Sequence, residues 1–124
     1  MVSYNEHLKK ILSQVIDSYN ILRMIQDKPG DLDTIKKEML KINGCLKVST
    51  NNIDEYKITI SDFKSLKSKF NSYLENYFFE QEIETMATLY SNDEYRVKNM
   101  RLKIIEALED KKMIESIEEL IGKL

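Results

Sequence analysis

The chain has 124 residues, enough for one domain whose hydrophobic core needs no disulfide or metal. Hydrophobic residues make up 42% and charged residues 32%, which is too apolar for a disordered chain, and no apolar run approaches the roughly 18 residues of a membrane span. The net charge of −2 argues against a chain whose whole surface serves nucleic acid.

The first predicted helix spans Tyr4–Asp27. Ser3 and Glu6 have the spacing of a capping box, in which each side chain accepts a backbone N–H at the helix start. Ile21 and Met24 widen the apolar face near the end, so we expect the last turn to be buried on two sides. Pro29-Gly30 stops the helix, because the residue before a proline is pushed out of the helical region. The face itself recurs every three or four positions: Leu8, Ile11, Leu12, Val15, Ile16, Tyr19, Leu22 and Ile25.

Asp31 or Asp33 is expected to cap a second helix, with Leu32, Ile35, Met39 and Ile42 on its inner face. Gly44 is expected to close it in the left-handed conformation, and the alternative is a longer helix with an internal glycine. The next segment, residues 45–60, alternates apolar and polar residues on both sides of the turn-forming run 49–54. We interpret it as a short β-hairpin, with a helix followed by a loop as the alternative.

The segment Ser61–Tyr90 carries the longest helical pattern. A straight helix of this length would measure roughly 43 Å, whereas a compact domain of this size has a radius of gyration of about 14 Å. The apolar face also reverses midway: Phe63, Leu66, Phe70, Tyr73, Leu74 and Tyr77 lie on one side, and Ile83, Met86 and Tyr90 nearly opposite. The helix is therefore expected to kink near Phe79–Glu82, to project from the domain, or to give its second half to another chain.

The remaining residues predict two further helices. Ser91 and Glu94 form a second capping box, with Tyr90 and Tyr95 placed as a hydrophobic staple across it. The apolar face reverses near residues 109–112, so we expect a turn there, with Asp110 as the N-cap of a last short helix. One long helix with two faces is the alternative. The first of the two helices should turn Val97, Met100, Ile104 and Leu108 inward, with Arg96, Lys98, Arg101 and Lys103 mostly outward or flanking, and the second should bury Met113, Ile117, Leu120 and Leu124.

Charged residues are grouped by sign along the chain. Residues 34–71 carry eight lysines and four acids, residues 75–94 carry six acids and no base, and residues 96–103 are again basic. Such an alternation predicts solvated helix faces that attract one another, at about 0.2–1 kcal/mol for each exposed pair.

One part of the chain resembles a known module. The second helix, the expected hairpin and a following helix that begins TISDF (residues 59–63) resemble the wing region of winged-helix DNA-binding domains. The resemblance implies phosphate contacts from lysines of this segment: Lys36, Lys37, Lys41, Lys47 and Lys57. No specific motif accompanies it, and the compact three-helix unit of such domains is missing. A small DNA-binding regulator is therefore the alternative function.

No catalytic or metal site is indicated by the sequence. His7 is the only histidine and Cys45 the only cysteine, whereas a zinc site needs three or four nitrogen or sulfur ligands. Glu80 and Glu84 share a helix face, but the Glu-x-x-His motif of a di-metal bundle site is absent. Neither of the glycine-rich phosphate-binding patterns occurs. We therefore expect no enzyme activity, no metal and no cofactor.

Together these patterns predict a mainly α fold, a four- or five-helix bundle of one domain, residues 1–124, with a small β-hairpin at about 45–60. The single cysteine suits a reducing cytoplasm, and residues 1–10 lack the apolar core of a signal peptide. The eleven Tyr and Phe residues are densest between Phe70 and Phe79, where they either fill the core or form an interface.

We expect a non-enzymatic protein-interaction module of the adaptor, chaperone, immunity or inhibitor type. The acidic run 75–94 would steer basic partners toward it. The partner is another protein or a second copy in a homodimer, with neither nucleic acid nor membrane involved. The residues expected to bind it are Tyr77, Phe78, Phe79, Ile83, Met86 and Tyr90.

Overall fold

The computed structural model describes residues 4–25, 30–51, 62–90 and 93–124. Within these ranges the chain forms α-helices and one 3-10 turn, and no strand. The mainly α bundle is therefore confirmed, with one helix more than expected because the segment 61–90 forms two. None of the helices so described is both long and apolar enough to cross a membrane. The helices are α1 (Tyr4–Met24), α2 (Asp31–Asn51), α3 (Asp62–Asn76), α4 (Phe79–Leu89), α5 (Glu94–Glu109) and α6 (Met113–Lys123), with the turn η2 at Asp110–Lys112.

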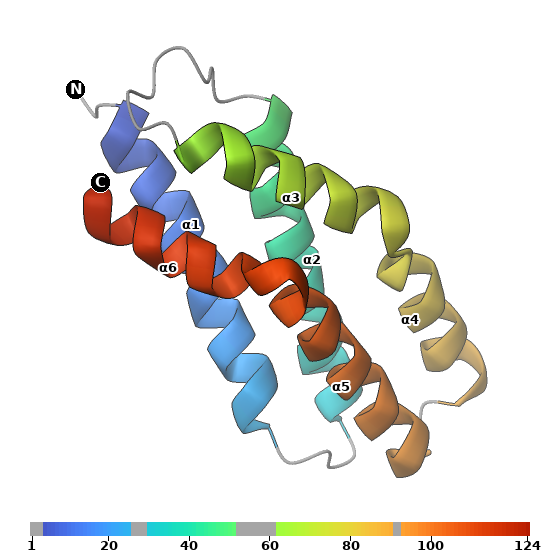
Figure 1. Ribbon diagram of the computed structural model, residues 1–124. Coiled ribbons are helices and arrows are strands. Elements are labelled where there is room, and N and C mark those ends of the chain that lie inside the picture. Colours follow the sequence, from blue (N-terminus) through green and yellow to red (C-terminus); the bar gives the residue numbers. More distant parts are fainter. Residues whose placement is uncertain (1–3, 26–29, 52–61, 91–92) are drawn as a thin grey trace.

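The helices surround one core (Figure 1). Helices α1 and α2 lie side by side and antiparallel, and α5 packs against both. Helix α3 packs on α2 and α6, α4 packs on α2 and α5, and α6 crosses α1 and closes the bundle. Every helix contributes its apolar face, through residues such as Leu12, Leu22, Ile35, Ile42, Phe63, Phe70, Phe79, Ile83, Ile104, Leu108 and Ile117.

The first two helices follow the predicted pattern on their inner faces, which are buried or packed against the core. The last turn of α1 does not, because Met24 is 79% exposed and Ile21 is also exposed. The expected burial of this turn on two sides is therefore wrong. Ser3 and Pro29, the expected boundary residues of the helix, lie outside the described residues.

The first arm of the expected hairpin is wrong, because residues 45–51 are the last turns of α2. Leu46 and Ser49 are fully buried and continue the face of Ile42 at helical spacing. The hydroxyl of Ser49 also donates to the carbonyl of Cys45 at 2.9 Å, a bond inside the helix. Burial of this face outweighs the strand preference of the β-branched residues. The second arm, residues 56–60, lies outside the described part of the chain.

The last two helices start differently from the prediction. Asp93 is the N-cap of α5, and its carboxylate accepts the backbone N–H of Arg96 at 3.1 Å. Ser91 lies outside the described residues, and Tyr95 is too exposed, at 74%, to act as a staple. The turn at residues 110–112 is confirmed, but the N-cap of α6 is Lys112 in the left-handed conformation, and Asp110 is not that cap.

Arg101 differs from the prediction, because its side chain is buried, whereas the basic residues of this helix were expected to lie mostly outward or flanking the apolar face. One guanidinium nitrogen, Nη1, donates to the backbone carbonyl of Leu22 at 3.0 Å. That carbonyl is among the last four of α1, which have no partner within the helix. Arg101 therefore caps the C-terminus of α1 from α5.

Candidate protein-interaction surface

The break between α3 and α4 lies at Tyr77 and Phe78. Tyr77 N–H still donates to the Tyr73 carbonyl at 3.2 Å, which is the last bond of α3, and Phe78 then leaves the helical conformation with φ −113° and ψ 50°. The break lets both halves of the reversed apolar pattern reach the same core, Phe63 and Phe70 from α3 and Phe79 from α4. A kink inside one core was the first of the expected outcomes, and it is confirmed, two residues earlier than Phe79–Glu82.

Three aromatic rings hold the junction in place. The Tyr77 and Phe79 rings are stacked, with centroids 5.2 Å apart and planes 14° from parallel. Tyr73 lies behind both, with its ring centroid 5.6 Å from that of Tyr77 and 6.2 Å from that of Phe79. Offset aromatic contacts of this kind add about 0.5–1.5 kcal/mol each beyond the area that they bury. Phe78, between them in sequence, takes no part in this cluster, and 63% of its surface is exposed.

The residues expected to bind a partner are divided between core and surface. Phe79 and Ile83 are fully buried in their own core, Tyr77 and Met86 are half-buried, and Phe78 and Tyr90 are exposed. Helix α4 separates the two exposed rings, and its 11 residues span roughly 16 Å. The Tyr90 ring is covered on one side by the Arg96 guanidinium, 3.9 Å from its centroid. The structure therefore brings Tyr77 and Phe78 together at one accessible place, and Met86 lines a separate hollow with Arg96 and Lys103.

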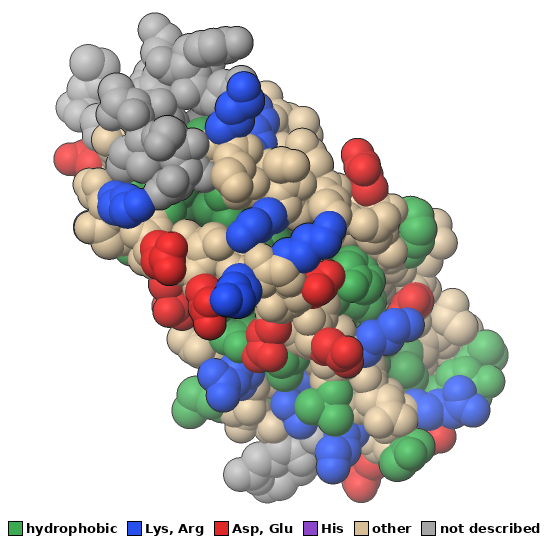
Figure 2. All heavy atoms as spheres, in the orientation of Figure 1, with side chains coloured by type: hydrophobic (Ala, Val, Ile, Leu, Met, Phe, Trp, Pro, Cys, Tyr) green, Lys and Arg blue, Asp and Glu red, His purple; other side chains and the backbone are tan. Residues whose placement is uncertain are grey.

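Two concave regions meet at Tyr77. The first, which we call the α2 hollow, has a volume of about 180 Å³ and is lined by Asn43, Lys47, Leu74, Tyr77, Phe78, Phe79, Glu80 and Gln81. The second, which we call the α5 groove, has a volume of about 590 Å³ and is lined by Tyr77, Lys103, Glu106, Ala107, Glu109 and Asp110. Together with the exposed ring of Phe78 they form what we call the junction surface. On the face shown in Figure 2, hydrophobic side chains form small patches between acidic and basic ones.

Ion pairs connect α4 to both of its neighbours. Lys36 and Lys47 of α2 reach Glu84 and Glu80 at 2.6 and 3.4 Å. On the other side, Lys103 of α5 reaches Glu82 at 3.1 Å. The predicted attraction between the acidic and basic runs is therefore confirmed. Because these glutamates already have cationic partners, the acidic field expected to steer a basic protein is weaker along α4. In the α5 groove, by contrast, the three carboxylates of Glu106, Glu109 and Asp110 line the wall with one lysine.

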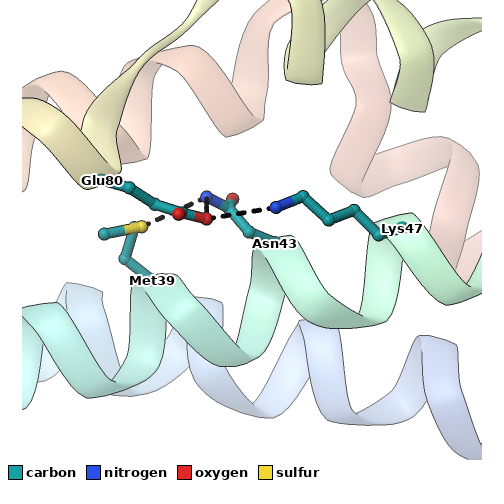
Figure 3. A network of polar contacts seen from close by, with 4 residues as sticks. All are labelled: Met39, Asn43, Lys47 and Glu80. Carbon is teal, nitrogen blue, oxygen red and sulfur yellow. Dashed lines mark hydrogen bonds and ion pairs between the residues drawn. The ribbon is translucent and has the colours of Figure 1, made fainter.

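A polar contact network lies under the α2 hollow (Figure 3). Asn43 is buried, and its Nδ2 donates to Met39 Sδ and to Glu80 Oε1, each at 3.2 Å. Lys47 Nζ donates to the same Glu80 oxygen at 3.4 Å. Within the described residues no donor reaches Asn43 Oδ1 or the buried hydroxyl of Tyr73. Burial, followed by the nearby charges of Tyr77 and Glu80, raises the pKa of Tyr73 well above its ordinary value.

Sequence reasoning missed Asn43. The sequence does indicate that Asn43 is buried, because it lies four residues after Met39 and so shares the inner face of the second helix. An asparagine at a buried helical position requires hydrogen-bond partners, and it therefore marks a polar site inside the bundle. Because Gly44 was expected to end the helix, Asn43 was expected at the helix end and not as a buried polar residue.

The lysines of the alternative DNA-binding function are largely engaged. Lys36 and Lys47 are in the ion pairs with α4, and Lys41 lies 3.5 Å from Glu38 on its own helix. Lys37 is exposed, and Lys57 lies outside the described residues. The segment expected to form a wing is helical up to Asn51.

Other chemistry finds little support in the described part of the chain. No group of His, Cys, Asp and Glu side chains there could hold a metal ion. Burial raises the pKa of the Cys45 thiol, and the nearby Lys41 only partly offsets this. A reactive thiolate needs the opposite shift. His7, the only histidine, is exposed on α1.

Comparison with known proteins gives no relative: no family model, no curated protein and no solved structure matches the chain.

Proposed function

We propose that this chain is a non-enzymatic protein-interaction module that binds a segment of another protein at the junction surface. The proposal rests on the exposed ring of Phe78. Phe78, with 63% of its surface exposed, lines the α2 hollow and is next in sequence to Tyr77, which also lines the α5 groove. Exposed aromatic rings of this kind serve as anchors at the centre of protein interfaces. Its place of action would be a reducing compartment such as the cytoplasm, which suits the single free Cys45.

The position of Phe78 strengthens this argument. Phe78 is the N-cap of α4 and makes no side-chain hydrogen bond there. Serine, threonine, aspartate or asparagine at an N-cap would stabilise the helix by about 1 kcal/mol relative to an apolar residue. The core does not need the ring either, since Phe79 fills the interior. Such a residue is available for a contact outside the chain, and its place in the α2 hollow distinguishes it from the other exposed apolar residues.

The charges around the junction surface indicate what the partner carries. The α5 groove has the acidic side chains of Glu106, Glu109 and Asp110, and Lys103, the cation among its described lining residues, is already paired with Glu82. A segment with an apolar side chain for Phe78 and basic side chains for the groove fits both features. A symmetric homodimer through this surface would instead place the acidic grooves near each other.

DNA binding has less support. Lys36 and Lys47, two of the lysines assigned to phosphate contacts, pair with Glu84 and Glu80. Nucleic acid would have to displace these acids before it could use the lysines, and it would then face the freed carboxylates.

A selection from a displayed random-peptide library tests the proposal. The wild-type chain and Phe78→Ser should be used side by side, with Leu89→Ser as the control, because Leu89 is 65% exposed at the other end of α4. Serine is a favoured N-cap, so Phe78→Ser is expected to fold at least as well as the wild type. Peptides selected on the wild type should bind Phe78→Ser at least tenfold more weakly, and Leu89→Ser equally well.

Equal affinity of the selected peptides for wild type and Phe78→Ser would refute the proposal, as would a selection that yields no specific binder. Sedimentation velocity adds a second criterion. A wild-type dimer that Phe78→Ser converts to a monomer would assign the surface to a second copy of the chain, and the foreign partner would be wrong.

A further inference from the structure

The buried amide of Asn43 has one side that the chain itself does not use. Only 7% of the residue is exposed, and within the described residues Oδ1 has no hydrogen-bond donor. The orientation of the amide is determined by its neighbours, because Nδ2 donates to the Glu80 carboxylate, which has no proton to give in return. Turning the amide over would place two acceptors against each other. Oδ1 is therefore a fixed acceptor that requires a donor from elsewhere.

The size of the α2 hollow limits what can supply that donor. Its volume of about 180 Å³ lies below the roughly 300–1,000 Å³ of pockets that enclose a small-molecule ligand. One large side chain of a partner is the occupant that matches this volume. The hollow has aromatic walls from Tyr77, Phe78 and Phe79, together with the polar groups of Asn43 and Glu80. The side chain must therefore combine a flat surface with more than one hydrogen-bond donor.

We propose that the α2 hollow receives an arginine side chain of the partner segment, a step that rests on the interaction function proposed above. The guanidinium is planar, carries five N–H donors and stacks on aromatic rings. One N–H would donate to Asn43 Oδ1 and another to the Glu80 carboxylate, while the plane lies against an aromatic wall. The chain already uses the same stacking elsewhere, where the Arg96 guanidinium covers the Tyr90 ring at 3.9 Å.

Glu80 can accept a hydrogen bond from the arginine, because its present contacts are weak. Its contacts with Asn43 and Lys47, at 3.2 and 3.4 Å, both fall on Oε1, so Oε2 takes part in neither. Both are longer than the roughly 2.7–2.9 Å of a strong charge-assisted hydrogen bond. The side chains of Glu80 and Lys47 are also about half exposed, at 47% and 55%. An incoming guanidinium can therefore donate to Oε2 while Oε1 stays bonded to Asn43 and keeps the amide in its orientation.

Lysine fits the same place less well. An ammonium is a compact, strongly hydrated charge, and it cannot lie flat against a ring while donating to two acceptors in a fork. The hollow also contains Lys47 already, which would be replaced by an equal charge without a gain in geometry. Discrimination between the two cations therefore separates the proposed fit from general attraction to acidic residues.

Nuclear magnetic resonance titration of the full ¹⁵N-labelled chain tests the assignment. The probes are N-acetyl-arginine methylamide and N-acetyl-lysine methylamide. The arginine probe should shift the backbone amides of residues 43–47 and 77–81 with a Kd in the millimolar range, and the lysine probe should bind at least fivefold more weakly. Asn43→Leu and Glu80→Gln should each weaken the arginine probe at least fivefold. Glu84→Gln is the matched control, one turn further along α4, because it breaks the Lys36 pair but does not line the hollow.

Equal binding of the two probes would refute the proposal, and so would shifts that persist in Asn43→Leu, shifts confined to Glu106–Asp110, or no shift at all. The peptides selected for the interaction test separate this failure from failure of the proposed function. Peptides that require Phe78 but bind Asn43→Leu as tightly as the wild type would overturn the arginine assignment and leave the interaction surface standing.

Discussion

Replacing Arg101 with methionine should lower the free energy of unfolding by about 2–3 kcal/mol. The variant keeps an unbranched apolar side chain in the buried position and removes the charge that caps α1. The bond from Nη1 to the Leu22 carbonyl is a buried, charge-assisted hydrogen bond, and such bonds contribute about 1.5–3 kcal/mol. A cation at a helix C-terminus adds about 0.3–1 kcal/mol, and methionine burial returns part of the loss.

Urea unfolding followed by circular dichroism at 222 nm measures this change in the free energy of unfolding. In a separate thermal unfolding experiment, the midpoint temperature should fall by roughly 10 °C. Arg96→Met is the control, because Arg96 lies on the same helix with half of its side chain exposed. Its pair with Asp93 and its contact with the Tyr90 ring both lie at the surface, so the control should change stability by no more than about 1 kcal/mol. A loss for Arg101→Met that equals the control would show that the cap on α1 contributes nothing, and the reasoning would be wrong. The loss of stability in Arg101→Lys should lie between those of Arg101→Met and the control, because lysine keeps the charge but not the planar guanidinium.

Three further substitutions test other parts of the structure. Gly44→Ala should raise the free energy of unfolding by about 1 kcal/mol in the same urea experiment, because Gly44 lies inside α2 and an added Cβ would meet no atom within 4 Å. Glu38→Met should raise it by about 1 kcal/mol, since the buried Glu38 has one carboxylate oxygen without a partner among the described residues. Burial, together with the hydrogen bond to Glu109 and its charge, raises the pKa of Tyr19 to about 12. The unfolded chain, with a tyrosine pKa of about 10, releases this proton first, so stability should be complete below pH 10 and fall toward pH 12. Tyr19→Phe should flatten that fall in urea midpoints measured across this range, and an unchanged slope would contradict the assignment.

The helices whose apolar residues face one core could be predicted from spacing alone. The inner faces of α1, α2 and α5 are examples, because a stripe such as Ile35, Met39 and Ile42 has only one way to be buried. Prediction failed where a local preference opposed the tertiary environment. The alternation of Leu46 and Val48 favours a strand, and Gly44 favours a helix end, yet α2 continues past both because Leu46 and Ser49 are buried on its inner face.

Arg101 shows a second limit of sequence reasoning. A charged residue next to an apolar face is usually solvated, and periodicity alone places Arg101 beside Met100 at the edge of that face. What draws it inward is the end of another helix, 79 positions away in sequence. Spacing along one helix contains no information about which backbone carbonyls a neighbouring helix leaves without partners.

The candidate surface was predicted in part. The reversal of the apolar face in residues 61–90 correctly indicated a break, and the break exposes Phe78. The same pattern could not decide which aromatic side chains the core absorbs, and Phe79 and Ile83 turn out to be internal. The spacing along a helix shows which side chains share a face, whereas the depth of the core on each side of α4 depends on how α2 and α5 pack against it.

The junction surface also gains rigidity from the way α4 is held. Exposed ion pairs such as Lys36–Glu84 and Lys103–Glu82 are worth at most about 1 kcal/mol each, so the burial of Phe79 and Ile83 provides most of the attachment energy. The pairs act on both sides of the helix, however, and they restrict its rotation and sliding between α2 and α5. The proposed partner would then bind a surface that is already in place, without the entropic cost of ordering a mobile helix. The exposed phenyl ring of Phe78 is thus presented by a helix fixed on two sides, and this arrangement favours a binding role over an incidental exposure.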